Sequence, residues 1–530
     1  MKILVVSEYH ILATGYATYY KNICQALHNA GHEVVELASY GDSNKPDHIK
    51  AATEAQWNVY LNIPPASDRE VWANYQHAKK HKHATEFGSW NFESVVVAER
   101  PDVVLAIRDH WYDKFIIDSP LSRYYISILS PTIDARPQRA EWIDTFKFAD
   151  HITSYNQWSE DWIREQTGLS NIISHIPPAP LDIYQPKNKD KARAELGIKK
   201  DAKILLTVMR NQIRKRYPEL FDTISKVNDP NIYLYCHCHH MDHGWDLASL
   251  ALQYGVGHKI LFSFKCNHCF KISTRLFNTN AKCEKCGGPQ EICSIDNGAT
   301  NDDLNTIYNA ADLYVQWHNS EGFGIPTIEA AAAGLKVITV RYSAQEDVAG
   351  KIDSFPIPPK LLEREIGNLC YRAVPDNEKL LELLNDKNVW EEYDRNEVSK
   401  KCRTNYNWAN TGKKWVDLIN SLTPKNNWED SPLLKSPPSF DKIKSLNNYD
   451  FVMSCIIDVL QDTRYIGSYI HSKTLDELET GISVPDDSAT GKKQNIFLKV
   501  TKEMVYQRFF QMLEEKVLWE RRKNQMLNAQ

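Results

Sequence analysis

The feature that most constrains the fold of this chain is an alternation of short apolar runs with amphipathic stretches, which continues up to a proline-rich break. Such alternation is typical of a parallel sheet covered by helices. Strands are expected at Ile3–Ser7, Val34–Leu37, Val103–Ile107, Tyr125–Leu129 and His151–Ser154, and a helix at Tyr19–Asn29. The break, Ile176-Pro177-Pro178-Ala179-Pro180, is a predicted hinge because proline lacks the backbone N–H and fixes φ.

A second α/β pattern follows the break. Its expected strands are Lys203–Val208, Ile232–Tyr235, Ile260–Phe264, Leu313–Gln316 and Val337–Val340. Two doubly wound units predict a cleft between them, and open parallel sheets bind ligands at the carboxyl ends of their strands. We therefore predict an α/β fold with an N-terminal domain at residues 1–180 and a C-terminal domain at residues 181–423.

The last part of the chain differs in composition from about Pro424 onward. Residues 424–530 are predicted to form a linker and a helical appendage. Helices are expected at Tyr449–Leu460 and Leu498–Met526, with a polar loop around Pro485-Asp486-Asp487. The apolar face of the last helix predicts packing on the body of the protein, or a surface for a partner or acceptor.

Composition limits the classes of function. A chain of 530 residues is too long for one ordinary core, and its net charge of −5 provides no global basic field for nucleic acid or anionic membrane. No run approaches the roughly 18 apolar residues of a membrane span, and the start turns polar too soon for a signal peptide. Eleven cysteines, four of them in two Cys-x-x-Cys pairs, favour a reducing compartment and a metal site. The expected location is the cytoplasm, or the host cytoplasm if the source is viral.

Two glutamates, Glu321 and Glu329, flank a loop that contains Gly322, Gly324 and Pro326. The loop joins an expected strand to an alanine-rich helix. Glycines let the backbone approach a ligand, and free amides at a helix start can hold a negative oxygen. Carboxylates accept directed hydrogen bonds from hydroxyl-rich ligands. The alternative is that these glutamates only cap the helix.

This segment resembles the signature E-G-F-G-x-P-x-x-E of the retaining GT-B glycosyltransferases of family 4, which continues into an alanine-rich helix and A-x-G-x-x-V-I. The resemblance implies that Glu329 holds the ribose hydroxyls of a nucleotide-sugar donor and that Glu321 faces the transferred sugar. It also implies that four residues approach the sugar and diphosphate: Gly322, Phe323, Gly324 and Ile325. UDP is the favoured nucleotide, and no catalytic metal is expected.

A basic block, Arg210 to Lys215, follows the first strand of the second unit and resembles the family's G-R-x4-K element, with Met209 in place of the glycine. The resemblance places Arg210 and Lys215 at the departing diphosphate. Glycosyl transfer builds negative charge on the leaving phosphate, so two cations there can do what a metal does in other transferases. The alternative is an exposed basic loop.

The first unit carries weaker similarities to the same family. Gly15 resembles the glycine loop near the diphosphate and acceptor, although the usual second glycine is missing. His110 lies where family members often carry a histidine near the sugar, which makes it a candidate sugar-contacting or acceptor-side residue; a satisfied surface histidine is the alternative. The resemblance covers about residues 1 to 422 with gaps, and it implies that transfer retains the anomeric configuration.

A second motif lies within the second unit. Cys266, Cys269, Cys283 and Cys286 form two Cys-x-x-Cys knuckles, and four thiolates favour a structural tetrahedral Zn²⁺. The predicted zinc ribbon spans residues 262–293. It serves either to fix a long insertion or to bind an acceptor. The neighbouring cluster from Cys236 to His240, with His243, is not assigned to a second metal.

Together these motifs predict a GT-B glycosyltransferase with a nucleotide-sugar donor. Its ribbon resembles that of family-4-like proteins of tailed phages, where hydroxymethylated DNA bases are glycosylated, so such a base is the expected acceptor. A surface polysaccharide, a lipid-linked glycan and a small metabolite are alternative acceptors. A catalytically dead, nucleic-acid-binding GT-B protein is a rival of another class, and a GT-B phosphorylase is disfavoured because no lysine motif for pyridoxal phosphate is evident. The sequence assigns no oligomeric state.

Overall fold

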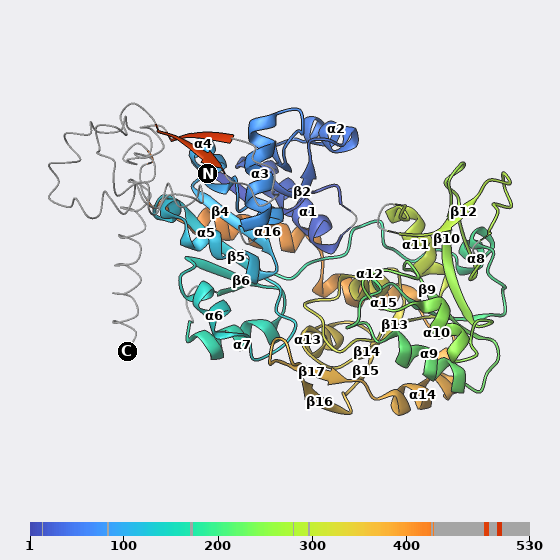
Figure 1. The fold of residues 1–530 in the computed structure, drawn as a ribbon. Coiled ribbons are helices and arrows are strands. Elements are labelled where there is room, and N and C mark those ends of the chain that lie inside the picture. Colours follow the sequence, from blue (N-terminus) through green and yellow to red (C-terminus); the bar gives the residue numbers. More distant parts are fainter. Residues whose placement is uncertain are drawn as a thin grey trace.

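The computed structural model describes residues 1–428 except 13, 82–83, 170–172, 279, 295–296 and 426–427, together with the strands at 482–486 and 496–500. Within this part the chain forms two α/β units that lie beside each other (Figure 1). The helix predicted at Tyr449–Leu460 and most of the one at Leu498–Met526 lie outside the described residues. No helix of the described part is long and apolar enough to cross a membrane.

The first unit contains a seven-stranded parallel sheet in the order β3-β2-β1-β4-β5-β6-β7. Its strands are β1 (Lys2–Glu8), β2 (Glu33–Asp42), β3 (Asn58–Ile63), β4 (Val103–Arg108), β5 (Ile126–Pro131), β6 (His151–Ser154) and β7 (Ile173–His175). The five strands predicted before the proline break are confirmed. Periodicity missed β3 and β7, because β3 is only partly buried and β7 is three residues long.

Helix α1 (Gly15–Asn29) covers one face of this sheet. It begins where the Thr14 side chain accepts a hydrogen bond from the Ala17 N–H, and its buried residues recur at helical spacing. The other helical elements of the unit are α2 (Pro46–Glu54), α3 (Arg69–His81), η1 (Thr85–Phe87), α4 (Phe92–Glu99), η2 (His110–Tyr112), α5 (Lys114–Asp118), η3 (Pro120–Arg123), α6 (Ala140–Lys147) and α7 (Gln157–Thr167).

The second unit contains an eight-stranded sheet with the path β11-β10-β9-β8-β13-β14-β15, and β12 also pairs with β10. The strands from β10 to β15 along this path are parallel, whereas β11 and β12 pair antiparallel with the edge strand β10 and so extend the sheet into the cysteine-rich insertion. Their bounds are β8 (Lys203–Thr207), β9 (Ile232–Cys236), β10 (Ile260–Cys266), β11 (Ile272–Leu276), β12 (Gln290–Ile292), β13 (Leu313–Gln316), β14 (Lys336–Val340) and β15 (Ser354–Ile357). The five predicted strands are confirmed.

Helices surround this second sheet, and a short antiparallel hairpin, β16 (Leu361–Arg364) with β17 (Tyr371–Val374), follows β15. The helical elements are α8 (Lys189–Leu196), α9 (Tyr217–Lys226), α10 (Leu247–Gln253), α11 (Asn301–Ala310), α12 (Ile325–Ala332), α13 (Ala344–Lys351), α14 (Asn377–Asn385), η4 (Lys387–Trp390), α15 (Arg395–Asn405) and α16 (Trp408–Ser421).

Helix α16 packs against α1 of the first unit, although the predicted boundary at residue 423 assigns it to the second. The indole N–H of Trp415 donates to the Tyr19 hydroxyl at 3.1 Å, and a Cβ on Gly412 would lie 3.2 Å from Ala26 Cβ. Beyond it, Trp428 stacks on Tyr124 with 4.9 Å between ring centroids. The chain therefore returns to the first unit, and the reason is tertiary packing that local periodicity does not encode.

The strands β18 (Ile482–Asp486) and β19 (Ile496–Val500) pair antiparallel with each other. The sequence predicts a polar loop at the first and the start of a helix at the second, so both predictions are wrong at these residues. Their backbone groups are satisfied by the pairing of the two segments, an interaction that helical periodicity in one segment cannot reveal.

Candidate active site

The loop between β13 and α12 carries the two glutamates predicted for the donor site. Gly324 caps α12 with φ +85°, and a Cβ there would lie 2.7 Å from the Gln345 amide nitrogen. Glycine is therefore required both by the left-handed backbone and by the close contact. Pro326 occupies the first turn, where its missing N–H costs nothing. The loop is thus fixed so that Glu321 precedes the helix and Glu329 lies within it.

Glu321 is the centre of a buried polar network. Its side chain is only 5% exposed, forms an ion pair with the Lys215 ammonium, and accepts hydrogen bonds from Arg214 Nη1 at 3.2 Å and Gln316 Nε2 at 2.5 Å. The Glu321 N–H donates to Ser343 Oγ at 2.9 Å. Burial, followed by the charge of Arg214, lowers the pKa of Lys215 well below its ordinary value. The structure therefore brings Glu321 and Lys215 together.

Arg210 and Arg214 lie in different surroundings. The Arg210 side chain is 41% exposed and forms a two-point ion pair with Asp242, with Nε 2.7 Å from Oδ2 and Nη2 3.2 Å from Oδ1. Arg214 instead contacts Glu321 and also donates to the Ser320 carbonyl at 3.1 Å. Sequence reasoning missed Arg214, and its position beside Lys215 in the basic block was the available signal.

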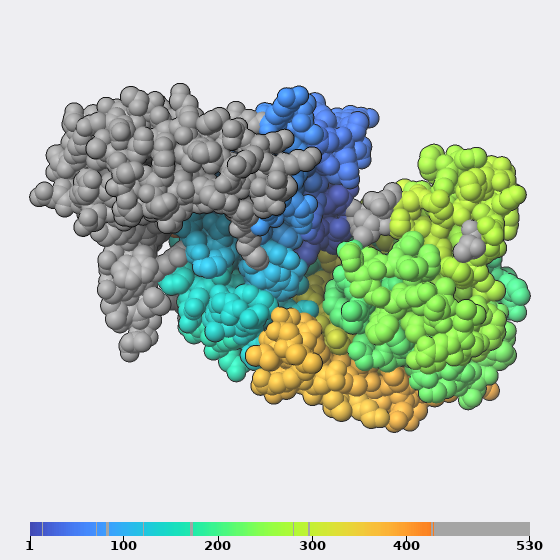
Figure 2. Space-filling view, viewed as in Figure 1, coloured from blue at the N-terminus to red at the C-terminus, as the bar shows by residue number. Residues whose placement is uncertain are grey.

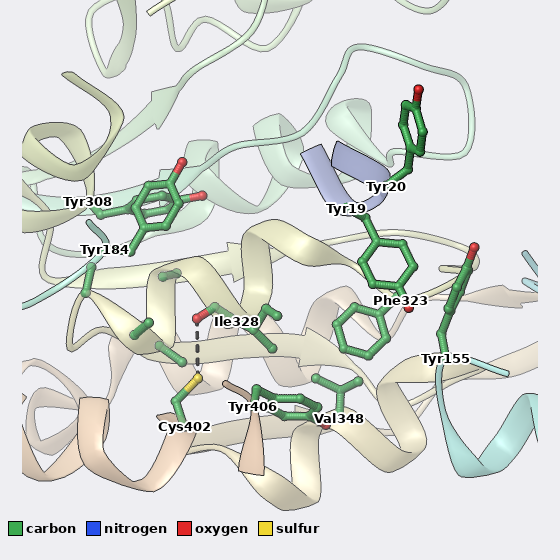
Figure 3. Packing of buried hydrophobic residues seen from close by; sticks show 14 of the residues in the cluster. Tyr19, Tyr20, Tyr155, Tyr184, Tyr308, Phe323, Ile328, Val348, Cys402 and Tyr406 are labelled. Carbon is green, nitrogen blue, oxygen red and sulfur yellow. Dashed lines mark hydrogen bonds between the residues drawn. The ribbon is translucent and has the colours of Figure 1, made fainter. Parts of the chain in front are cut away.

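Glu329 lies in α12 and is 7% exposed. The Tyr308 hydroxyl donates to its Oε2 at 2.9 Å, and burial raises the pKa of the Glu329 carboxyl to about 7. Figure 3 shows Tyr308 beside Tyr184, and their ring centroids are 5.7 Å apart. The same view shows a hydrogen bond from the Cys402 thiol of α15 to the carbonyl of Ile328, the residue before Glu329. This carboxylate is consequently held by tyrosines and by packing from α15.

Two of the predicted donor residues meet the first unit. A Cβ on Gly322 would lie 2.1 Å from Thr132 Cγ2, and the Gly322 carbonyl accepts from Asn156 Nδ2 at 3.0 Å. A Cβ on Gly15, at the start of α1, would lie 3.5 Å from Ile325 Cδ1. Phe323 is different, because its ring packs in the core against Tyr406 with centroids 5.7 Å apart (Figure 3).

A further link between the units is an ion pair from Asp134 Oδ2 to Arg372 Nη1 at 2.8 Å. Ser320, the neighbour of Glu321, donates to the same carboxylate at 3.2 Å. Burial opposes the charge on Asp134, yet Arg372 and then Arg214 hold its pKa below the ordinary value. The two units therefore meet at the loop between β13 and α12. Figure 2 shows the surface hollowed between the blue N-terminal residues and the yellow-green residues of the second unit.

His110 lies inside the first unit rather than on its surface. Its Nε2 is 3.0 Å from Gln138 Oε1, its ring packs against Trp111, Trp142 and Phe146, and burial lowers its pKa to about 4. The preceding residue, Asp109, accepts a hydrogen bond from the Tyr16 hydroxyl at 2.7 Å, and burial raises its pKa to about 7. Tyr16 also contacts Thr132 at 2.5 Å, so Asp109 lies beside the contact between the units.

The four cysteines of the insertion converge, with all four sulfur atoms within 4.8 Å of one another. Cys266 Sγ lies 3.5 Å from Cys286 Sγ, and Cys269 Sγ lies 3.6 Å from Cys283 Sγ. Four Zn–S bonds of about 2.3 Å at tetrahedral angles place the sulfurs about 3.8 Å apart, so the arrangement fits such an ion. Among the described residues this is the only cluster of three or more potential ligands, and the histidines after β9 form none.

Comparisons with known proteins agree with this geometry. The family model described as glycosyl transferases group 1 matches residues 273–360, a range that contains the loop from Glu321 to Glu329. A search of curated proteins by sequence gives no match.

Several solved structures share the fold. Sucrose-phosphate synthase from Thermosynechococcus elongatus is 16% identical with a TM-score of 0.56, and the match covers 79% of this chain and 98% of that one. HepE from Anabaena, solved in complex with UDP and glucose, is 12% identical with a TM-score of 0.56 over 80% and 100% of the two chains. WaaG, a glycosyltransferase involved in lipopolysaccharide biosynthesis, is 14% identical with a TM-score of 0.53 over 80% and 100%. The chain has the GT-B fold. The predicted fold class is therefore confirmed.

Proposed function

We propose that this protein is a glycosyltransferase that moves a sugar from a UDP-sugar to a hydroxyl group. The observation that carries the proposal is the loop between β13 and α12, in which Glu321 and Glu329 lie on either side of a glycine-capped helix start and cations converge on Glu321. The glycosyl transferases group 1 match includes this loop. UDP is proposed as the nucleotide because HepE, which shares the fold, holds UDP and glucose.

Each donor-site residue has a role that fits its surroundings. Glu329 accepts hydrogen bonds from the ribose hydroxyls, for which its ionised form is the better acceptor. Glu321 orients the transferred sugar. Arg210, Arg214 and Lys215 stabilise the diphosphate as its negative charge grows, and the amides at the start of α12 assist them. These basic side chains take the place that a metal ion holds in other transferases, so no catalytic metal is proposed.

We further propose that transfer retains the anomeric configuration. The bond from the anomeric carbon to the phosphate oxygen breaks while the acceptor oxygen forms its bond on the same face. The acceptor proton passes to an oxygen of the departing diphosphate, so no protein nucleophile is required. The role of this chain is to hold both partners and to neutralise the leaving group. His110 is a positioning residue in this scheme, because its ring lies in an aromatic cage behind Asp109.

The cysteine cluster is proposed to hold one structural Zn²⁺. Its sulfur separations fit a tetrahedral ion, and four thiolates leave no position open for a substrate. The ion would fix the two turns that β10 and β12 carry at the edge of the second sheet.

The first candidate acceptor is a glycan hydroxyl, and the second is a hydroxymethylated base in DNA. The carboxyl edge of the first sheet carries Glu8 and Asp109, which favour an uncharged, hydroxyl-rich acceptor over a polyanion. The DNA base is the second candidate because the ribbon exposes Phe270 with Lys271, Lys282 and Lys285, a combination suited to nucleic acid.

Titration with UDP tests the donor site. Glu329→Ala should weaken UDP binding by about 1.5–3 kcal/mol, roughly 10- to 150-fold, because it removes an ionised hydrogen-bond acceptor. Glu378→Ala, on the exposed face of α14, is the matched control and should bind like the wild type. Arg214→Ala should slow transfer more than it weakens binding of uridine. Equal UDP affinity in the wild type and Glu329→Ala would contradict the assignment.

Mass spectrometry after incubation with UDP-glucose, UDP-galactose or UDP-N-acetylglucosamine then tests the reaction. The acceptor arms are neutral oligosaccharides, hydroxymethylated DNA, unmodified DNA and no acceptor. A mass increase of one sugar on an acceptor supports a transferase. UDP binding without turnover of any donor would support the dead, nucleic-acid-binding alternative instead.

A further inference from the structure

Five aromatic side chains form a continuous strip along the carboxyl edge of the first sheet. The aromatic strip consists of Tyr40, Phe87, Tyr112, Trp111 and Trp142. Neighbouring ring centroids along it are 5.4, 3.7, 5.9 and 5.1 Å apart in that order, and the Phe87–Tyr112 pair is stacked. These residues come from β2, η1, η2 and α6, so four separate segments build one surface.

The strip lies at the surface, not in the core. Tyr40 is 37% exposed and the other four rings are half-buried, whereas His110 and Phe146 lie buried beneath them. Tyr40 adopts φ +62°, a left-handed conformation that bulky residues rarely occupy. Such strain persists where the surrounding structure fixes it, and it clusters at ligand sites. Here it presents a large ring to solvent at the end of a buried strand.

One end of the strip adjoins the carboxylates of the acceptor side. Asp109 immediately precedes η2, whose two rings are the third and fourth of the strip, and its charge also reaches Tyr40, the first ring. Burial, and then the nearby charge of Glu8, raises the pKa of Tyr40 to about 12. Glu8 in turn lies close enough to Arg210 of the second unit for their charges to interact. The strip therefore leads away from the site where the donor loop meets the first unit.

The charges around the strip decide which ligand it suits. Arg108, beneath Phe87, is buried and paired with Asp113 at 2.6 Å. Arg139, over Trp142, is paired with Glu141 at 2.9 Å. Each of these two cations already has a carboxylate partner, so the wall presents flat apolar faces together with carboxylates. Sugar rings fit such a wall, since their C–H faces pack on aromatic rings and their hydroxyls donate to carboxylates, whereas a phosphodiester backbone would need cations.

We infer that the aromatic strip is the binding platform for an oligosaccharide acceptor. This inference rests on the glycosyltransferase function proposed above and adds the class of substrate. The reacting hydroxyl lies at the Glu8 and Asp109 end, next to the donor loop, and further sugar units extend along the rings toward Trp142. The strip thus selects a glycan chain rather than a single small metabolite.

A matched pair of substitutions tests the platform. Tyr40→Asn removes a ring from the strip. Phe270→Asn removes a comparable ring from the ribbon. Both residues are exposed aromatics with positive φ, +62° and +58°, and asparagine tolerates that backbone. Isothermal titration of the full chain uses neutral malto-, cello- and chito-oligosaccharides and a hydroxymethylcytosine-containing duplex, each without donor. Trp142→Leu provides a second strip variant, and a thermal melt of each protein verifies folding.

The inference expects an oligosaccharide to bind the wild type, Tyr40→Asn to weaken that binding about ten-fold, and Phe270→Asn to leave it unchanged. UDP affinity should be equal in all three proteins. Binding of none of these sugars, or equal sugar affinity in the wild type and both strip variants, would overturn it. So would DNA binding that Phe270→Asn alone weakens. Loss of the proposed donor function would appear separately, as a wild type that binds oligosaccharide but not UDP.

Discussion

Contact between the two units at Gly322 yields a prediction that can be worked through from the structure. A methyl group on Gly322 would lie 2.1 Å from Thr132 Cγ2 of the first unit. Non-bonded carbons are most favourable at about 3.5–4.0 Å, so the two units must separate by roughly 1.5 Å or Thr132 must move. Gly322→Ala should therefore disfavour the closed arrangement while leaving each unit folded.

The size of the effect on closure can be taken from the usual cost of adding a methyl group to a packed contact. An extra methyl in a well-packed contact costs about 1–3 kcal/mol, which shifts a closing equilibrium by about 5- to 150-fold. Transfer should slow by a factor in that range, because the first unit is then less often in contact with the loop between β13 and α12. UDP affinity should change little, since Glu329 and the cations of the basic block belong to the second unit.

The matched rescue is Thr132→Ser. Serine keeps the oxygen that contacts the Tyr16 hydroxyl at 2.5 Å, and it removes only the methyl that clashes. The next nearest atom, Thr132 Cβ, lies 3.5 Å away, which is an ordinary contact. The double variant should therefore recover most of the lost rate.

The assay combines transfer kinetics with small-angle X-ray scattering, which reports closure independently of activity. Gly322→Ala should show a larger radius of gyration than the wild type, and the double variant should return to the wild-type value. A Gly322→Ala protein that is as compact and as fast as the wild type would refute the reasoning. So would a double variant as slow as the single one.

Two further predictions concern the metal and the pH dependence. One zinc ion per chain is expected by elemental analysis. Cys283→Ser should lose this ion, and its melting temperature should fall by several degrees. The control Cys402→Ser, at a buried cysteine outside the cluster, should leave the zinc content unchanged. The pKa of Glu329 is about 7 in the folded chain against 4.5 for a free glutamate, so the folded state binds the extra proton and stability falls as pH rises through this window. In urea denaturation, Glu329→Gln should consequently be more stable than the wild type at pH 8 by up to roughly 3 kcal/mol, and similar to it near pH 4. An equal difference in stability at both pH values would contradict the explanation by a buried carboxyl group.

Most of the fold could be predicted from the sequence because its elements are locally encoded. Buried strands such as β13 are short, mostly apolar runs, and the structure gives that strand the predicted bounds. Helix α1 shows helical spacing and a threonine cap. The pairing of β18 with β19 could not be predicted, because it depends on two segments finding each other.

Part of the candidate site could also be predicted. Glu321 and Glu329 lie within one short loop and helix start, and Arg210 to Lys215 is one continuous block, so a local motif can identify each set. Arg214 was missed because a sequence motif gives the position of a residue but not the direction of its side chain. In the structure the Arg214 side chain turns toward Glu321, whereas that of Arg210 turns toward Asp242. The burial of His110 beneath Trp142 could not be predicted either, because it depends on how the whole unit folds.

The sequence by itself determined most of the secondary structure, the two-unit architecture, the glycine-capped loop between β13 and α12, and the four-cysteine set. Each of these rests on spacing within a few residues or on backbone conformations that only glycine and proline satisfy. Tertiary structure alone decided that Gly322 meets Thr132, that α16 returns to the first unit, and that rings from four segments align as the aromatic strip. Such contacts join residues far apart in the chain, and close packing of whole elements fixes them, so no local pattern records them.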